Sequence, residues 1–261
     1  LCVDKTGTLT GDRITLEYYM DILGNESRQV LDFAYLNSLY HTGVRNHLDD
    51  AVLRCREMPG AAPHYQKIEQ DCRKLDALPF DHERRLASVL VEYEGEPLLI
   101  VKGSAEEVFR RCSHVEYRGE RREIDADGSA SLHAIVDEML EDGMKVLAVA
   151  YKPLEQETLS REAEDGLTLL GYLAFFDAPK QSAAAAIGKL QQLHVDVRVL
   201  TGDNRETAVS ICRRLGIDTA HTLTGGELEQ LGDNEILVKI EHTTVFSELT
   251  PRQKVQVVQI L

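Results

Sequence analysis

The sequence lacks any long apolar run. The longest, such as "LLIV" at 98–101, fall far short of the roughly 20 residues that a helix needs to cross a bilayer. The N-terminus also lacks the charged-then-apolar pattern of a signal peptide. With 43% hydrophobic and 28% charged residues, the 261-residue chain is expected to fold in water around one large core or two moderate ones.

Positive charge and cysteine are also scarce. The net charge is −15 and no run rich in Lys or Arg occurs, which argues against a nucleic-acid partner and leaves room only for a compact basic pocket. The cysteines are odd in number and form no C-x-x-C pair, which indicates reduced thiols in a cytosolic compartment. They are Cys2, Cys55, Cys72, Cys112 and Cys212.

Two kinds of hydrophobic pattern divide the chain. The middle stretch combines helical and strand-like patterns with hairpin turns and is typical of an antiparallel α+β domain. We expect helices at 26–40 and 47–56 and strands at 86–93, 97–102, 114–118, 145–151 and 167–175. From Asp177 onward, helix and strand alternate as in a parallel sheet. We expect helices at 180–193, up to Leu215 and from Pro251, and strands at 195–200 and 243–247.

The opening residues Leu1–Val3 look like the end of a buried strand, which needs a parallel sheet to lie in. We therefore assign 1–13 and 176–261 to one α/β domain and 14–175 to an inserted domain. The chain would cross between them near Arg13 and Asp177.

Asp4 follows the opening strand, and the "KTGT" turn comes next. Open α/β sheets bind ligands at the carboxyl ends of their strands, and the Gly7 turn exposes N–H groups suited to phosphate. An aspartate is ionised at neutral pH, so Asp4 could attack phosphorus without a general base if Mg²⁺ and a lysine neutralise the phosphate. A solvated turn with a helix cap is the alternative for this motif alone.

Five motifs occur in a fixed order: "DKTGTLT", "KGSAEE", "DAPK", "TGDN" and "TPRQK". Together they resemble the cytoplasmic catalytic region of P-type cation-transporting ATPases, over nearly the whole chain. The resemblance implies a haloacid-dehalogenase-like, Rossmann-like phosphorylation domain with an inserted α+β nucleotide-binding domain built on an antiparallel sheet.

The resemblance also implies a catalytic centre. Asp4 would accept the γ-phosphoryl group of ATP, and Mg²⁺ would bind the Asp4 carboxylate and the Thr6 carbonyl. Lys254 would neutralise the transferred group. The complete catalytic set is Asp4, Lys5, Thr6, Thr201, Gly202, Asp203 and Lys254.

For the nucleotide, the resemblance implies that Phe80 of "LPFDHERRLASV" stacks on adenine, with Lys102 and Gly103 lining the pocket. Asp49 falls where the family usually has a Glu that contacts the adenine amino group. Lys145 falls where a basic residue reaches the ATP phosphates.

Three features depart from the family pattern. Glu248 stands where relatives often carry Arg, so one phosphate-facing charge is absent or supplied elsewhere. Ser104-Ala105 replaces the commoner Ala-Pro. The Gly-Asp-Gly-x-Asn-Asp segment, whose Asp completes the Mg²⁺ site, is expected after Lys254 but is not found before Leu261. We therefore expect a segment excised from a membrane protein and lying on the cytoplasmic face of a bacterial inner membrane.

Stretches between the motifs, such as "TLLGYLAFFDAPK", look most like bacterial magnesium-transporting P-type ATPases. The expected partners are ATP, a transported cation and the membrane. The alternatives are a calcium or other cation pump, a soluble phosphatase of the same superfamily, and a nucleotide-binding module without catalysis. Such a phosphatase would carry Asp-x-Asp, whereas the second acidic position is here Thr6.

Overall fold

The computed structural model describes residues 1–11, 14–43 and 45–261, which form two compact units. The first unit contains Leu1–Ile14, Met139–Met144 and Asp177–Leu261, and the second contains Thr15–Glu138 and Lys145–Phe176. The crossing expected near Arg13 falls at residues 12 and 13, which lie outside the described residues.

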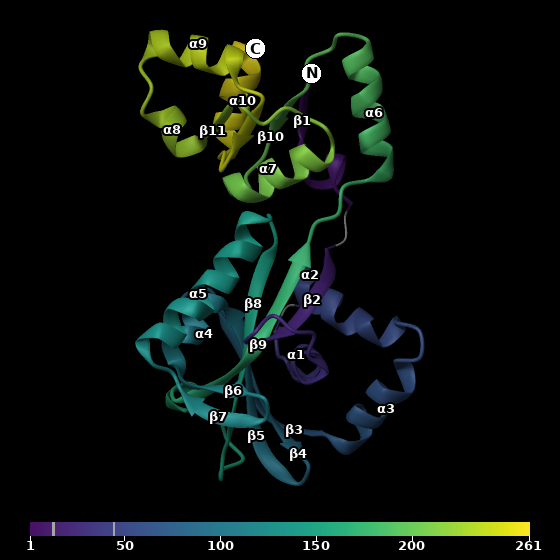
Figure 1. Cartoon of the computed structure of the whole chain (residues 1–261), viewed down its shortest axis with the longest axis vertical. Coiled ribbons are helices and arrows are strands. Elements are labelled where there is room, and N and C mark those ends of the chain that lie inside the picture. Colours follow the sequence, from purple (N-terminus) through teal and green to yellow (C-terminus); the bar gives the residue numbers. More distant parts are fainter. Residues whose placement is uncertain (12–13, 44) are drawn as a thin grey trace. The chain divides into compact units, whose positions relative to one another are not determined.

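The first unit is built on a parallel sheet of four strands in the order β1-β10-β12-β11. The strands are β1 (Cys2–Asp4), β10 (Arg198–Leu200), β12 (Val245–Ser247) and β11 (Thr222–Thr224), and they are drawn with their helices in Figure 1. The helices are α6 (Gln181–Gln192), α7 (Arg205–Arg214), α8 (Gly225–Glu229), α9 (Asp233–His242) and α10 (Pro251–Ile260).

Buried apolar side chains hold these helices on the sheet. Leu200, Leu223 and Phe246 come from three neighbouring strands, and they pack with Leu228 of α8, Ile240 of α9 and Val257 of α10. The helices begin at polar caps, since Asn204 accepts a bond from Thr207 N and Thr250 forms a capping box with Gln253. The "TGDN" and "TPRQK" motifs are therefore helix starts.

The strand expected at 195–200 is shorter than predicted and covers Arg198–Leu200 alone. The residues just before this strand form the C-terminal cap of α6. His194 has a left-handed φ of 55°, and Val195 N donates to Leu190 O at 2.9 Å. The alternating pattern of "VDVRVL" does not reveal this helix cap.

The second unit is built on an eight-stranded sheet in the order β3-β4-β5-β8-β9-β6-β7, with β2 also paired to β9. The strands are β2 (Thr15–Asp21), β3 (Arg73–Asp81), β4 (Leu86–Tyr93), β5 (Glu96–Ser104), β6 (Cys112–Tyr117), β7 (Glu120–Glu123), β8 (Lys145–Pro153) and β9 (Leu167–Phe176). The expectation of an antiparallel sheet holds except at one pair: β6 runs parallel to β9. Every residue of β9 is buried, which explains its unbroken apolar sequence.

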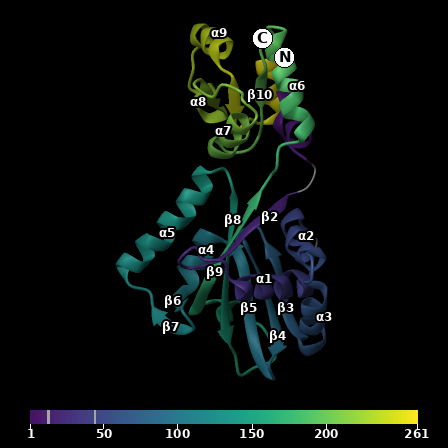
Figure 2. The same cartoon turned by 45° about the vertical axis from the view of Figure 1, so that its right-hand side comes forward.

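Helices cover both faces of this sheet. The helices are α1 (Arg28–Tyr40), α2 (His47–Leu53), α3 (Ala62–Asp71), α4 (Ala105–Arg111) and α5 (Ala126–Glu141), with short 3₁₀ turns η2 (Arg54–Glu57) and η3 (Arg161–Glu164). In both views α1, α2 and α3 lie on one side of the sheet and α4 and α5 on the other (Figure 1, Figure 2). The sequence pattern predicts α1 and α2 but not α3, α4, α5, β2, β3 or β7. Within the described residues no helix is long and apolar enough to span a membrane.

Two adjacent glycines at the start of α8 offer a test of packing in the first unit. A Cβ on Gly225 would lie 2.5 Å from Glu248 O, whereas a Cβ on Gly226 would meet nothing within 4 Å. We expect Gly225→Ala to lower the free energy of unfolding by about 1–3 kcal/mol. Gly226→Ala should leave it unchanged or raise it by up to about 1 kcal/mol, because alanine favours helix. Urea unfolding followed by circular dichroism measures both, and equal midpoints would contradict the predicted clash.

Candidate functional site

The carboxyl ends of β1, β10 and β12 bring together the residues predicted to be catalytic. Asp4 is paired with Leu200 and Leu200 with Phe246, so Thr201 and Ser247 follow at the same edge of the sheet. Lys254 lies in the first turn of α10, and its Nζ is 3.0 Å from Asp4 Oδ2. The Asp4 side chain is 51% exposed. This arrangement gives an accessible carboxylate next to the ammonium group of Lys254, as a nucleophile for an anionic substrate requires.

The side chain of Lys5 points into the unit and is completely buried. Its Nζ lies 2.8 Å from Asp177 Oδ2 and 2.5 Å from Asp203 Oδ2. Burial opposes the charge, but the bonds and attraction from the two carboxylates outweigh it and raise the pKa of Lys5 above 10.5. The sequence predicts Lys5 to be one of the catalytic residues; in the structure its buried ammonium connects three chain segments beneath the site.

The turn between Asp4 and Thr10 has an irregular backbone. It is the wide helical turn η1 (Lys5–Leu9), in which Thr6 is extended at ψ 127° and Gly7 has φ 77°. Only glycine adopts that φ without strain, so the motif needs a glycine at this point. The ammonium of Lys180 donates a hydrogen bond to the Gly7 carbonyl.

The loop after β10 is held by its own polar groups. Thr201 Oγ1 donates to Asp203 Oδ2 at 3.0 Å and accepts from Asp203 N at 3.1 Å. A second loop braces it, because Leu249 N donates to Thr201 O at 3.0 Å and Glu248 N to Asp203 O at 2.8 Å. A Cβ on Gly202 would lie 3.4 Å from Leu249 O, an ordinary contact distance, so the packing of the two loops does not itself require glycine here.

The oxygen atoms at this edge fit part of a magnesium site. Mg²⁺ prefers carboxylate and carbonyl oxygens and completes its shell with water and phosphate. The exposed carboxylate of Asp4 is one such donor, and the Thr6 carbonyl follows in the adjoining turn. Among residues 1–11, 14–43 and 45–261 no three His, Cys, Asp or Glu side chains are arranged to hold a metal. A divalent ion here would thus depend on groups beyond these side chains.

The second unit has a pocket of about 320 Å³ at the ends of β3 and β5. It is lined by four of the five residues predicted to bind nucleotide: Asp49, Phe80, Lys102 and Gly103. Phe80 is 40% exposed and its ring meets that of His82 edge to face at 5.2 Å. An exposed aromatic ring beside an apolar hollow can stack on a flat base.

A buried ion pair lies in the pocket wall. Lys102 Nζ is 2.6 Å from Asp49 Oδ1 and also donates to Ser38 Oγ. Burial lowers the pKa of Lys102, and the Lys102 charge lowers the pKa of Asp49 although burial opposes this. The sequence predicts that Asp49 contacts an adenine amino group. In the structure Lys102 and Ser38 both donate to its Oδ1, and Asn46 N donates to its Oδ2 at 3.5 Å.

Gly103 lines the pocket, and packing requires glycine at this position. A Cβ on Gly103 would lie 2.4 Å from Arg85 O and 2.6 Å from Leu86 Cδ2, so the neighbouring strand β4 and its turn require glycine here. Lys145 does not line the pocket. It is exposed at the start of β8, on the same face as the pocket residue Leu147 and about 7 Å along the strand.

Sequence reasoning missed several residues that the structure brings to these sites. Asp177 and Lys180 belong to the "DAPK" motif, which indicates the family but predicts no role for either side chain. His41, Asn46, His82, Arg85 and Ser104 also line the pocket. The Nδ1 atom of His41 and the Oγ atom of Ser104 are buried without a hydrogen-bond partner among the described residues. Of these lining residues, Asn46 has a recognisable sequence signal, because an asparagine before a predicted helix is a typical N-cap.

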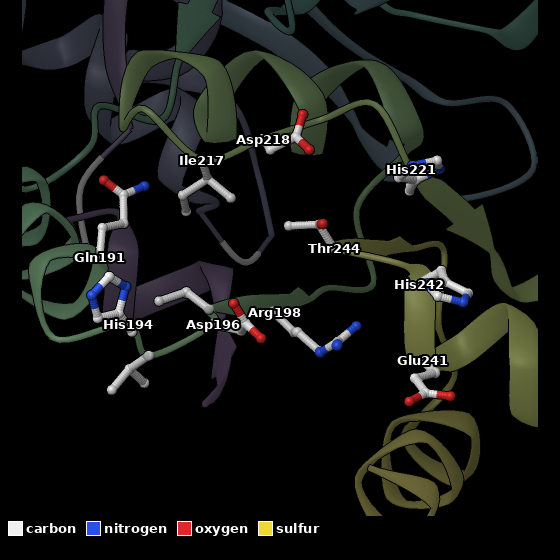
Figure 3. Close-up of a pocket in the computed structure, with 12 residues that line it drawn as sticks. Gln191, His194, Asp196, Arg198, Ile217, Asp218, His221, Glu241, His242 and Thr244 are labelled. Atoms are coloured by element: carbon white, nitrogen blue, oxygen red, sulfur yellow. The ribbon is translucent and has the colours of Figure 1, made fainter.

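A larger pocket, of about 490 Å³, contains none of the predicted residues. It is lined by Arg198 at the start of β10 and Thr244 just before β12, hence at the amino ends of the strands and opposite Asp4. Figure 3 shows Gln191 and His194 on one side of it and Glu241 and His242 on the other. Ligands of open α/β sheets bind at the carboxyl ends of the strands, which favours the Asp4 edge over this pocket as the functional site.

Comparison with known proteins supports the predicted resemblance. A family model described as "P-type ATPase, cytoplasmic domain N" matches residues 42–182. Over its whole length the chain is 38% identical to "Magnesium-transporting ATPase, P-type 1" of Escherichia coli (strain K12) and 40% identical to a protein of that name from Salmonella typhimurium (strain LT2). It is 26% identical over 99% of its length to "Calcium-transporting ATPase 1" of Lactococcus lactis. The resemblance inferred from the motifs is confirmed.

The chain spans only part of these relatives. It covers 29% of the length of each magnesium-transporting protein and 31% of the calcium-transporting one. The identities are higher with the magnesium transporters, as the stretches between the motifs predict.

The buried Lys5 cluster leads to a prediction about stability. Lys5→Met would leave the carboxylates of Asp177 and Asp203 facing each other without their cation. We expect a loss of about 3–5 kcal/mol in the free energy of unfolding at pH 7. Because the folded-state pKa of Lys5 is raised, its stabilisation is fully present below pH 10.5 and is lost as the pH rises through the higher folded value.

Urea unfolding of both proteins at pH 7 and above pH 10.5 tests this, and the difference between them should shrink at the higher pH. Lys189→Met, at an exposed position of α6, is the matched control and should unfold like the parent. A Lys5→Met protein as stable as the parent at pH 7 would contradict the assigned role of the cluster.

Proposed function

The chain belongs to the P-type ATPase family, and from that membership we propose that it forms the ATP-binding and phosphorylated part of a membrane cation pump. ATP would phosphorylate Asp4, and the aspartyl phosphate would drive transport in other parts of the pump. Magnesium is the proposed cargo, because the relatives named as magnesium transporters share the most sequence with this chain. The chain would lie on the cytoplasmic face of the membrane.

The observation that carries this proposal is the position of Asp4. Asp4 is the last residue of β1 in a parallel sheet, its side chain is half exposed, and Lys254 Nζ lies 3.0 Å from its Oδ2. The parallel order β1-β10-β12-β11, with loops converging at the carboxyl ends, supports a haloacid-dehalogenase-like phosphorylation domain.

The residues around Asp4 support phosphoryl transfer in particular. The ionised carboxylate would attack phosphorus directly, and the ammonium group of Lys254 would neutralise the incoming phosphate oxygens. Mg²⁺, held by Asp4 and the Thr6 carbonyl, would supply further charge to the phosphoryl group. The Thr201–Asp203 loop at the same edge would face the same phosphate. Thr6 offers no carboxylate to hydrolyse an acyl phosphate at once, which disfavours a soluble phosphatase.

The second unit would bind the nucleotide. Its pocket combines an exposed phenylalanine with the buried Lys102–Asp49 pair. We propose that Phe80 stacks on adenine and that the ion pair shapes the wall behind the base. Lys145, two residues along β8 from Leu147, would meet the phosphates at the edge of the pocket.

Phe80→Ala should weaken ATP binding without unfolding the unit, because the ring is 40% exposed. The loss of a base–aromatic stack predicts about 1–3 kcal/mol, or about 5- to 150-fold in Kd. Titration with a fluorescent ATP analogue measures this in the present chain. Tyr18→Ala is the matched control, since Tyr18 is 48% exposed and lies on β2, away from the pocket. Equal affinity of the Phe80→Ala and Tyr18→Ala variants would rule out the stacking role.

Asp4→Asn should abolish the transfer of the γ-phosphate of ATP to the full-length pump, because the amide keeps the shape but is no nucleophile. ATP affinity should be unchanged or higher, since one negative charge no longer repels the phosphate. Radiolabelled ATP, acid quench and hydroxylamine treatment measure the acyl phosphate. Asp218→Asn, a change at a carboxylate on the opposite edge of the sheet, should label like the parent. A label that resists hydroxylamine would instead indicate Ser or Thr.

A further inference from the structure

The segment 177–180 runs alongside the turn that follows Asp4. Gly11 N donates to Ala178 O at 3.1 Å and Lys180 N donates to Leu9 O at 2.8 Å. Thr10 and Pro179 form an antiparallel bridge between these bonds. The backbone of one segment therefore fixes the end of the turn in the other.

Side chains at both ends of 177–180 continue this contact. Asp177 Oδ2 accepts bonds from Lys5 Nζ at 2.8 Å and Thr10 Oγ1 at 3.2 Å. Lys180 donates its ammonium hydrogen to the Gly7 carbonyl, in a partly buried position. Lys180 is also the N-cap of α6, so the helix start holds its backbone in place.

The hydrogen bond from Lys180 to the Gly7 carbonyl fixes the orientation of the Gly7–Thr8 peptide. A trans peptide points its C=O and N–H in opposite directions, so a carbonyl fixed by Lys180 directs the Thr8 N–H away from Lys180. Rotation of this peptide changes ψ of Gly7, which is −19° here, and glycine restricts that angle little because it has no Cβ. The ammonium group also adds positive charge beside a turn that would meet phosphate.

We propose that Lys180 is a positioning residue for phosphoryl transfer: it holds the Gly7–Thr8 peptide in the orientation that presents the turn to the phosphate. This inference rests on the proposed phosphorylation of Asp4. Lys180 would act through the turn and would not itself receive the phosphate.

The test compares Lys180→Met, Lys180→Arg and the control Lys189→Met in the full-length pump. We expect Lys180→Met to slow phosphoenzyme formation by about 10- to 100-fold, since small displacements at a reacting centre have effects of this size. The Kd for ATP should stay within about twofold, because the proposed base pocket is in the other unit. Arginine keeps the charge and the donor and should restore most of the rate, and Lys189→Met should behave like the parent.

Hydrogen exchange of a peptide covering residues 5–11 provides an independent measurement. Lys180→Met should exchange faster there, and Lys180→Arg should not. A Lys180→Met pump that forms phosphoenzyme at the parent rate would overturn the inference. If the parent itself never labels, the proposed function fails, and the exchange result still decides whether Lys180 holds the turn.

Discussion

The site depends on the ion pairs that the Lys5 ammonium group forms with Asp177 and Asp203. Lys5 is completely buried, and its two carboxylate partners come from positions 172 and 198 residues further along the chain. Burial of a lysine is costly unless its charge is paired, so each carboxylate must stay close for the fold of this unit to be stable. The turn after β1, the loop after β10 and the segment at 177 are thereby tied to one point.

Asp4 and Lys5 are adjacent in the sequence, yet one side chain is exposed and the other is buried. Asp4 ends β1 and is half exposed, whereas Lys5 begins the turn and points inward. The inward lysine fixes the base of the turn, so the outward aspartate is held without making buried contacts of its own. The proposed role of Asp4 as a nucleophile needs this combination, because a carboxylate buried among partners would be neither accessible nor free to react.

The sequence predicts the positions of residues better than their directions. Asp4, Thr201 and Lys254 meet because strand ends and helix starts are legible in "DKTG", "TGDN" and "TPRQK". That Lys5 points inward, or that Asp49 pairs with Lys102 53 residues away, depends on packing between distant elements that local pattern cannot show. The same holds for Gly103, where the turn before β4 requires glycine. The strand expected at 195–200 is shortened by a helix cap, and β2 and β3 escape prediction because their burial is irregular.

Both units place a buried lysine–aspartate pair beside the residues proposed to meet substrate. In the first unit Lys5 pairs with two carboxylates and its pKa is raised. In the second unit Lys102 pairs with one carboxylate and burial lowers its pKa. Desolvation opposes the charge of both lysines; two carboxylates outweigh it at Lys5, whereas at the fully enclosed Lys102 a single carboxylate does not. Lys5 is thus firmly charged and suited to hold loops together. Lys102 instead fixes Asp49 and Ser38 in the wall of its pocket.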